Sequence, residues 1–100
     1  MARLDVRRLK QARGVALVVE LQAELLSDLD TVIVVPLVPV RRLPPIAEIN
    51  PLVEFEGQSV AVRLEQLVSI PRSRLGNVAG SLLKDEYQIM RALDRLLSRT

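Results

Sequence analysis

Hydrophobic and polar positions alternate along the first half of the chain, and a period of two is typical of β-strands. Residues 3–9 alternate charged and apolar side chains, and a β-branched run suited to a buried strand follows Gly14 over residues 15–21. Residues 31–37 predict the strongest strand. Within it Pro36 has no N–H to donate, so we expect it at a strand end, at a bulge or on an edge. The chain therefore begins as a strand-rich fold.

Polar and proline-rich stretches separate these runs. Residues 22–30 lose the β-branched character and predict a loop, with one helical turn over residues 23–26. Residues 38–43 continue the preceding strand or bend away as another short one. The double proline Pro44-Pro45 then breaks regular structure.

A β-hairpin is predicted in the second half of the chain. Residues 52–55 and 59–64 place apolar side chains at alternating positions on either side of Glu56-Gly57, as a hairpin with one buried face requires. Residues 67–70 add a short apolar strand that ends before a proline.

The C-terminal segment changes from a period of two to a helical period. After a predicted turn at residues 75–76, residues 81–98 predict a helix with Ser81 as its N-cap. An apolar stripe recurs at helical spacing and consists of Ile89, Leu93, Leu96 and Leu97, widened by Leu82, Tyr87 and Met90.

This order of elements predicts an all-β fold with an appended helix, or α+β by stricter definition: a bent antiparallel sheet with the helix packed across it or across a partner. One hundred residues make a single domain, residues 1–100.

The composition is 49% hydrophobic with one Phe, one Tyr and no Trp. Such an aliphatic surplus on a small domain is typical of a dimer interface, and we expect a homodimer.

Composition excludes many kinds of chemistry. The chain has no His and no Cys, which excludes Ser-His, Cys-His and zinc-thiolate or zinc-imidazole sites, and it has no glycine-rich phosphate loop. The loose carboxylate pairs at residues 28/30 and 54/56 lie at predicted strand or turn positions, where we expect them to be solvated. We expect no metal, no cofactor and no enzymatic activity. Short apolar runs and a charged N-terminus predict a cytosolic protein without a membrane span.

Charge is unevenly distributed around a net value of +2. Residues 1–13 carry five basic groups and one acidic group, a net charge of +4, whereas residues 14–40 carry a net charge of −4. The basic segment fits an acidic polypeptide or a phosphate backbone, or it forms a solvated strand face. Because no aromatic side chain is interleaved for base stacking, the sequence favours the solvated face over nucleic-acid binding.

Two motifs flank the start of the third predicted strand, Val-Glu-Leu-Gln-Ala-Glu-Leu-Leu at residues 19–26 and Val-Val-Pro-Leu at residues 34–37. They resemble Val-Asp-Val-Gln-Ser-Asp-Ile-Ile and Val-Ile-Pro-Leu of the CcdB toxins. The resemblance continues at residues 51–55, at Ser-Ile-Pro in residues 69–71 and along residues 86–97. It covers nearly the whole chain.

The resemblance implies the toxin of a type II toxin–antitoxin pair. CcdB toxins have an SH3-like barrel, shared with MazF toxins, with a C-terminal helix, and they are homodimers. They poison DNA gyrase through its A subunit and are neutralised by the CcdA antitoxin. Toxin and antitoxin together repress their own operon, so DNA is a partner only through the antitoxin complex.

The resemblance also assigns residues. The family's gyrase-poisoning end is a C-terminal Trp-Gly-Ile, and the matching positions here are Ser98, Arg99 and Thr100. Glu86 is expected as a further gyrase contact on the helix. This chain lacks the Trp whose large aromatic surface anchors an interface. We therefore expect the three positions to face gyrase, but we do not expect the family's potency of gyrase poisoning. For the acidic antitoxin tail, the charge of the N-terminal segment predicts binding through Lys10 and Arg13.

Two alternatives remain at this point. The first is a degenerate CcdB-like protein that binds antitoxin without poisoning gyrase. The second is an endoribonuclease toxin of the MazF/Kid type, which shares the barrel and helix. Without His, RNA cleavage needs a carboxylate base and an arginine, for which Glu20 or Glu24 with Arg41 are the candidates.

Overall fold

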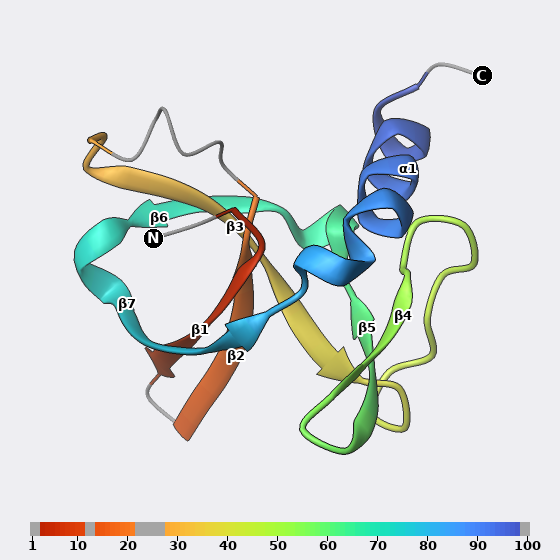
Figure 1. The fold of residues 1–100 in the computed structure, drawn as a ribbon, viewed down its shortest axis with the longest axis horizontal. Helices are drawn as coiled ribbons and strands as arrows, with labels where there is room; N and C mark the ends of the chain where they lie inside the picture. Colours follow the sequence, from red (N-terminus) through yellow and green to blue (C-terminus); the bar gives the residue numbers. More distant parts are fainter. Residues whose placement is uncertain (1–2, 12–13, 22–27, 99–100) are drawn as a thin grey trace.

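The computed structural model describes residues 3–11, 14–21 and 28–98. Within these ranges the chain forms strands, short 3-10 helices and one α-helix (Figure 1). The strands are β1 (Asp5–Gln11), β2 (Gly14–Glu20), β3 (Thr31–Pro39), β4 (Leu52–Phe55), β5 (Gln58–Val62), β6 (Val68–Pro71) and β7 (Leu75–Ser81). The helices are η2 (Leu64–Gln66), η3 (Arg72–Arg74), η4 (Leu83–Asp85) and α1 (Glu86–Leu97).

The strands form one curled antiparallel sheet in the order β4-β5-β3-β2-β1-β7. β3 is the central strand, and one of its sides is shared by two partners: β6 pairs with its first half and β5 with its last residues. α1 lies beside the β4–β5 hairpin (Figure 1). The predicted bent antiparallel sheet with a C-terminal helix is therefore confirmed.

Pro36 lies inside β3, at the point where its two partners change. β6 pairing ends at Val34, and β5 pairing begins at Leu37. The Pro36 carbonyl faces this side and accepts a hydrogen bond from the Arg63 N–H at 3.0 Å. Since N and O of one strand residue point to the same side, the missing N–H falls in the gap between β6 and β5, where no strand requires a donor.

β3 is apolar after Thr31 because it is buried on both faces. Val35 and Leu37 belong to the larger core, which α1 covers with Ile89 and Ala92. Val32 and Val34 point to the opposite face and belong to a smaller second core. A strand buried on both faces needs a near-continuous β-branched run, which is the pattern that made this strand the most predictable one.

The β4–β5 hairpin has the predicted turn. Glu56 and Gly57 have φ values of 51° and 80°, the left-handed pair that joins two antiparallel strands through two residues. The turn leaves Glu54 and Glu56 exposed, and Asp28 and Asp30 are exposed as well, so the expected solvation of these carboxylates is confirmed.

Several expected boundaries were wrong. The first strand spans Asp5–Gln11 rather than residues 3–9. Residues 38–39 continue the preceding strand as expected, but the chain turns at residues 40–42, so β3 ends at Pro39 and residues 40–43 are not strand. The apolar run 59–64 is divided, because β5 ends at Val62 and the chain enters η2. Residues 75–76 begin β7 rather than form a turn, since Leu75 pairs with Leu9 of β1. The expected helical turn over residues 23–26 lies outside the described residues.

The C-terminal helix is shorter than residues 81–98. Ser81 ends β7, and its Oγ accepts the Leu83 N–H at 3.1 Å, which starts η4 instead of capping α1. Most of the predicted stripe faces the core, since Leu82 and Ile89 are buried and Met90, Leu93 and Leu96 pack against it. Ala92 is also buried, whereas Tyr87 and Leu97 are largely exposed. Among the described residues no helix is long and apolar enough to cross a membrane.

Candidate functional site

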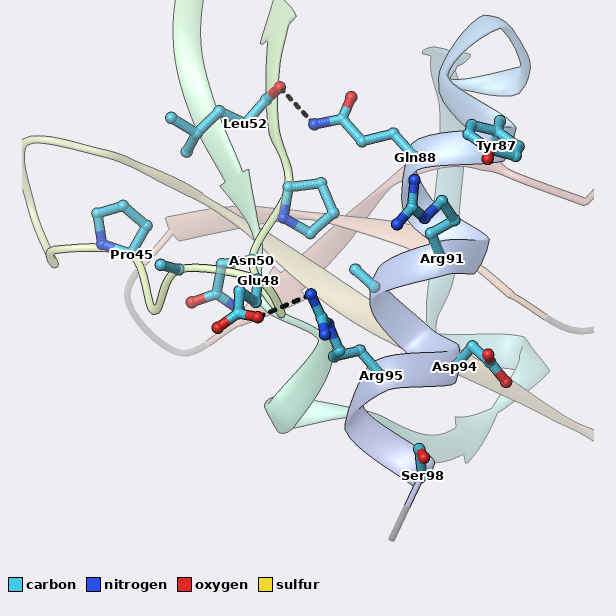
Figure 2. Close-up of a pocket in the computed structure, with 13 residues that line it drawn as sticks. Pro45, Glu48, Asn50, Leu52, Tyr87, Gln88, Arg91, Asp94, Arg95 and Ser98 are labelled. Carbon is cyan, nitrogen blue, oxygen red and sulfur yellow. Dashed lines mark hydrogen bonds and ion pairs between the residues drawn. The ribbon is translucent and has the colours of Figure 1, made fainter. Parts of the chain in front are cut away.

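A groove of about 840 Å³ runs between α1 and the loop before β4, and Figure 2 shows it. The loop side includes Pro45, Glu48, Asn50, Pro51 and Leu52, and the helix side includes Tyr87, Gln88, Arg91, Arg95 and Ser98. Its size is within the range of ligand-binding clefts. Along α1 the groove ends at Ser98, the residue that follows the helix.

Two polar bridges cross the groove. Gln88 Nε2 donates to the Leu52 carbonyl oxygen at 3.4 Å, and Arg95 forms an ion pair with Glu48 at 2.8 Å. Arg91 lies between them on the side of α1 that faces the loop, one helical turn before Arg95 (Figure 2). Since both partners of the Arg95–Glu48 pair are more than half exposed, the pair contributes little to stability.

The loop wall of the groove is fixed from behind by Asn50, which is 5% exposed. Its Oδ1 accepts the Ile46 N–H at 2.7 Å, and its Nδ2 donates to the Val62 carbonyl at 3.3 Å and to Glu65 Oε1 at 2.6 Å. These bonds connect the loop to the end of β5 and to η2.

Arg63 completes the support of the loop. Its guanidinium donates to the Pro44 carbonyl at 3.0 Å and pairs with Glu65 at 2.9 Å. Burial opposes ionisation of the Glu65 carboxyl, but the hydrogen bond from Asn50 and the charge of Arg63 outweigh it, so the pKa of Glu65 is lower than its ordinary 4.5. The wall is therefore held in place before any ligand arrives.

The residues expected at the gyrase-facing end are only partly described. Ser98 follows the last residue of α1 and is exposed, whereas Arg99 and Thr100 lie outside the described residues. Glu86 is the first residue of α1 and is paired with Arg3, so it connects the N-terminal segment to the start of the helix. Glu86 and Ser98 thus lie at opposite ends of α1.

The residues expected to bind the antitoxin lie on another part of the molecule. Lys10 is exposed on β1, opposite Val15 of β2. Arg13 lies outside the described residues. The structure does not place Lys10 in the groove along α1.

The arrangement considered for RNA cleavage, Glu20 with Arg41, is not assembled. Glu20 lies at the end of β2 opposite Val34, while Arg41 is in the turn after the far end of β3. Glu20 is 4% exposed and forms ion pairs instead with Arg7 at 3.1 Å and with Arg72 at 3.9 Å. Glu24 lies outside the described residues.

The Glu20 cluster holds parts of the fold together. Burial raises the pKa of Glu20 above its ordinary 4.5, and Arg7 and Arg72 offset only part of this effect. Arg72 also donates from Nε to the Leu29 carbonyl at 2.9 Å, and its backbone N–H donates to the Asp30 carbonyl at 2.7 Å. The cluster therefore joins β1, β2 and η3 to the segment that enters β3.

Comparison of the sequence with protein families decides the family. The family model described as CcdB protein matches residues 3–98, nearly the whole chain. The chain belongs to the CcdB family. The resemblance of residues 19–26 and 34–37 to the CcdB toxins is thereby confirmed. No match was found among the curated proteins.

Solved structures with the same fold as this CcdB family member include the following three. One is described as an endoribonuclease in complex with its cognate antitoxin from a mycobacterial species, with 14% identity and a TM-score of 0.81, covering 100% of this chain and 97% of that one. Another is the Mycobacterium tuberculosis toxin MazF-mt6, with 22% identity and a TM-score of 0.74, covering 90% and 93%. The third is MazE-MazF from Deinococcus radiodurans, with 16% identity and a TM-score of 0.76, covering 100% and 97%. At these identities the likeness shows the shared fold.

Sequence reasoning missed the groove of this CcdB family member. The spacing of Arg91 and Arg95 places both on one helical face, but only the fold shows that this face looks onto residues 45–52. Tyr87 was assigned to the buried stripe, whereas it is 74% exposed at the groove's rim.

Proposed function

We propose that this CcdB family member is the toxin of a type II toxin–antitoxin pair, that it binds the A subunit of DNA gyrase, and that a CcdA-like antitoxin neutralises it. The family match carries the proposal, because it spans the whole barrel and continues along α1 to Ser98. The protein then acts by binding alone, without enzymatic activity, in the cytoplasm where gyrase works. It contacts operator DNA only through the antitoxin complex.

The gyrase-facing surface in this proposal is the C-terminal end of α1. Leu97 is 71% exposed there, and Ser98 follows it. Leu97 offers apolar area next to the tip, but less than an indole ring supplies, so we expect weaker gyrase poisoning than from a chain ending in Trp-Gly-Ile. In the limiting case the protein binds antitoxin without poisoning gyrase.

The endoribonuclease alternative has less support. The fold is shared with endoribonuclease toxins, but Glu20 is buried in ion pairs with Arg7 and Arg72 and lies at the opposite end of β3 from Arg41. A carboxylate enclosed in this way is poorly placed to take a proton from an RNA 2′-hydroxyl.

We propose a homodimer as the active form. Several large apolar side chains are exposed near α1 and on β7, among them Leu83 (57%), Val78 (54%) and Leu97. Apolar side chains so exposed on a small domain are typical of an interface between copies. Size-exclusion chromatography with light scattering at micromolar concentration should give twice the chain mass of 11.2 kDa. A stable monomer would contradict the proposal.

The target is tested by induced expression in two hosts, one with ordinary gyrase and one with a CcdB-resistant gyrase A subunit. We expect growth arrest in the first host and growth in the second. Total RNA from both cultures is run on a gel. Arrest in both hosts with cleaved RNA supports the endoribonuclease alternative, and no arrest in either host supports the degenerate toxin.

A further inference from the structure

The groove between α1 and residues 45–52 presents one cation without a carboxylate partner. Among the described residues no carboxylate forms an ion pair with Arg91, and its guanidinium carbon lies 5.7 Å from the centre of the Tyr87 ring. Asp94 also lines the groove, but its side chain points away from the loop (Figure 2). The charged side chains that point toward the loop or the groove are therefore those of Arg91, Arg95 and Glu48, and their net charge is positive.

Arg91 and Arg95 form a pair with a defined spacing. Four residues along an α-helix rise about 6 Å. Two residues along an extended peptide advance about 6.6 Å, and their side chains lie on the same face of the peptide. Carboxylates at alternate positions of an extended segment therefore match the two guanidinium groups, whereas adjacent carboxylates point to opposite faces.

The remaining lining favours a peptide over a nucleic acid. Pro45, Ala47 and Pro51 line the loop side and offer apolar contact but no aromatic ring on which bases can stack. The Tyr87 ring lies at the rim and is covered on one face by Arg91. Glu48 would repel a continuous row of phosphates, whereas a peptide carboxylate can displace it from Arg95 because that pair is exposed and weak.

We propose that this groove binds an extended acidic peptide segment with carboxylates at alternate positions, one on Arg91 and the next on Arg95, where it replaces Glu48. The proposed function supplies the source of such a segment, the antitoxin, and the inference rests on it for that source alone. Because Asn50 and Arg63 already hold the loop wall, binding requires little ordering of the toxin. A segment in this groove ends beside Ser98, at the end of the helix proposed to face gyrase.

The inference is tested by NMR titration of the full chain with two blocked peptides, Gly-Glu-Ser-Glu-Gly and Gly-Glu-Glu-Ser-Gly, which have the same composition and charge. We expect the alternating peptide to shift the amide signals of residues 87–98 and 45–52, and to bind at least about threefold more tightly than the peptide with adjacent glutamates. Equal binding of the two peptides, or shifts confined to other parts of the chain, would overturn the proposal.

Variants of the chain make the assignment specific. Arg91→Gln should weaken binding of the alternating peptide about fivefold, and Glu48→Gln should strengthen it about twofold, because Arg95 is then free of its competitor. Arg74→Gln removes an exposed arginine on η3, away from the groove, and should leave affinity unchanged. If Glu48→Gln weakens binding, or if Arg74→Gln weakens it as much as Arg91→Gln, the assignment is wrong.

A poly-uridine oligonucleotide serves as the nucleic-acid probe. If it shifts the same groove signals at lower concentration than the alternating peptide, the groove is a nucleic-acid site and the proposal is overturned. These titrations involve no gyrase. A chain that binds the alternating peptide but does not arrest growth contradicts the proposed gyrase activity alone, and a chain that arrests growth but ignores the peptide contradicts this inference alone.

Discussion

The Phe55 ring occupies the space that a side chain at residue 80 would need. A Cβ built on Gly80 lies 2.7 Å from Phe55 Cε1, and Phe55 is buried in the larger core. Gly80 belongs to β7 and Phe55 to β4, the two strands at opposite ends of the sheet order. The curled sheet therefore closes through an aromatic ring resting on a glycine, without backbone pairing between these strands.

Gly80→Ala should consequently destabilise the protein by about 1–3 kcal/mol, because the added methyl group overpacks a buried ring. Urea denaturation monitored by circular dichroism gives the free energy of unfolding. In the double variant Gly80→Ala with Phe55→Leu, the loss of free energy of unfolding should be smaller than the sum of the losses in the two single variants. Strict additivity would mean that the two side chains do not compete for the same space.

Asn50→Ala should lower the free energy of unfolding by roughly 3 kcal/mol, because buried partners such as the Ile46 N–H and the Val62 carbonyl lose their hydrogen bonds. Asn77→Ala is the matched control, since Asn77 is exposed on β7 and should cost less than about 0.5 kcal/mol. Equal effects from the two substitutions would contradict the role given to Asn50 in fixing the groove's wall.

The local sequence pattern was sufficient to predict those strands and turns whose structure depends mainly on their own residues. The β-branched run of β3 and the Glu56-Gly57 turn were predicted because burial on both faces and two left-handed residues leave direct marks in the sequence. β7 was missed because its sequence, Leu-Gly-Asn-Val-Ala-Gly-Ser, has low strand propensity. It is extended because β1 pairs with it, and no local pattern records that pairing.

The candidate site was predicted less well than the fold for the same reason. The groove exists because residues 45–52, far earlier in the chain, pack beside α1. Conversely, Glu20 was a candidate for chemistry because RNA cleavage without His needs a carboxylate base. Its burial by Arg7 and Arg72 depends on β1 and η3, which only the folded chain brings to it.

Glu20 and Glu65 should change the pH dependence of stability in opposite directions. The pKa of Glu20 is raised, so between 4.5 and that higher pKa the folded protein binds more protons than the unfolded chain, and this contribution to the free energy of unfolding falls as pH rises. The pKa of Glu65 is lowered, so its contribution is present above pH 4.5 and is lost as pH falls through the folded pKa.

Urea denaturation of Glu20→Gln and Glu65→Gln from pH 3 to pH 7 measures both effects. Relative to the unaltered protein, Glu20→Gln should make stability rise more steeply with pH above 4.5, and Glu65→Gln should reduce the loss of stability below 4.5. The same sign of change for both variants would contradict the surroundings assigned to these carboxyls.

Charge reversal at the basic N-terminal segment should slow binding of the antitoxin. Lys10→Glu with Arg13→Glu removes attraction for an acidic tail, and such charges mainly change the association rate and its salt dependence. We expect association about tenfold slower at low salt, with a flatter salt dependence, by stopped-flow fluorescence. Arg41→Glu with Arg42→Glu makes the same change of net charge on exposed turn residues. Equal slowing by both double variants would mean that only total charge matters.

Replacing Ser98, Arg99 and Thr100 with Trp-Gly-Ile should raise toxicity. A Trp side chain buries about 150–250 Å² at an interface, and truncating an anchor of this kind often costs 2 kcal/mol or more. At about 1.4 kcal/mol per tenfold, the gain in affinity for gyrase exceeds an order of magnitude. α1 ends at Leu97, so the replacement follows the helix and leaves the buried Ile89 and Ala92 untouched.

Gyrase-mediated DNA cleavage is measured for the unaltered chain, for the Trp-Gly-Ile variant and for an Ala-Gly-Ile control that lacks only the indole. Enhanced cleavage by the Trp variant alone places the tip against gyrase. If none of the three traps cleaved DNA while all still bind antitoxin, the protein is a degenerate toxin, because a restored anchor on an intact helix would then have no gyrase surface to meet.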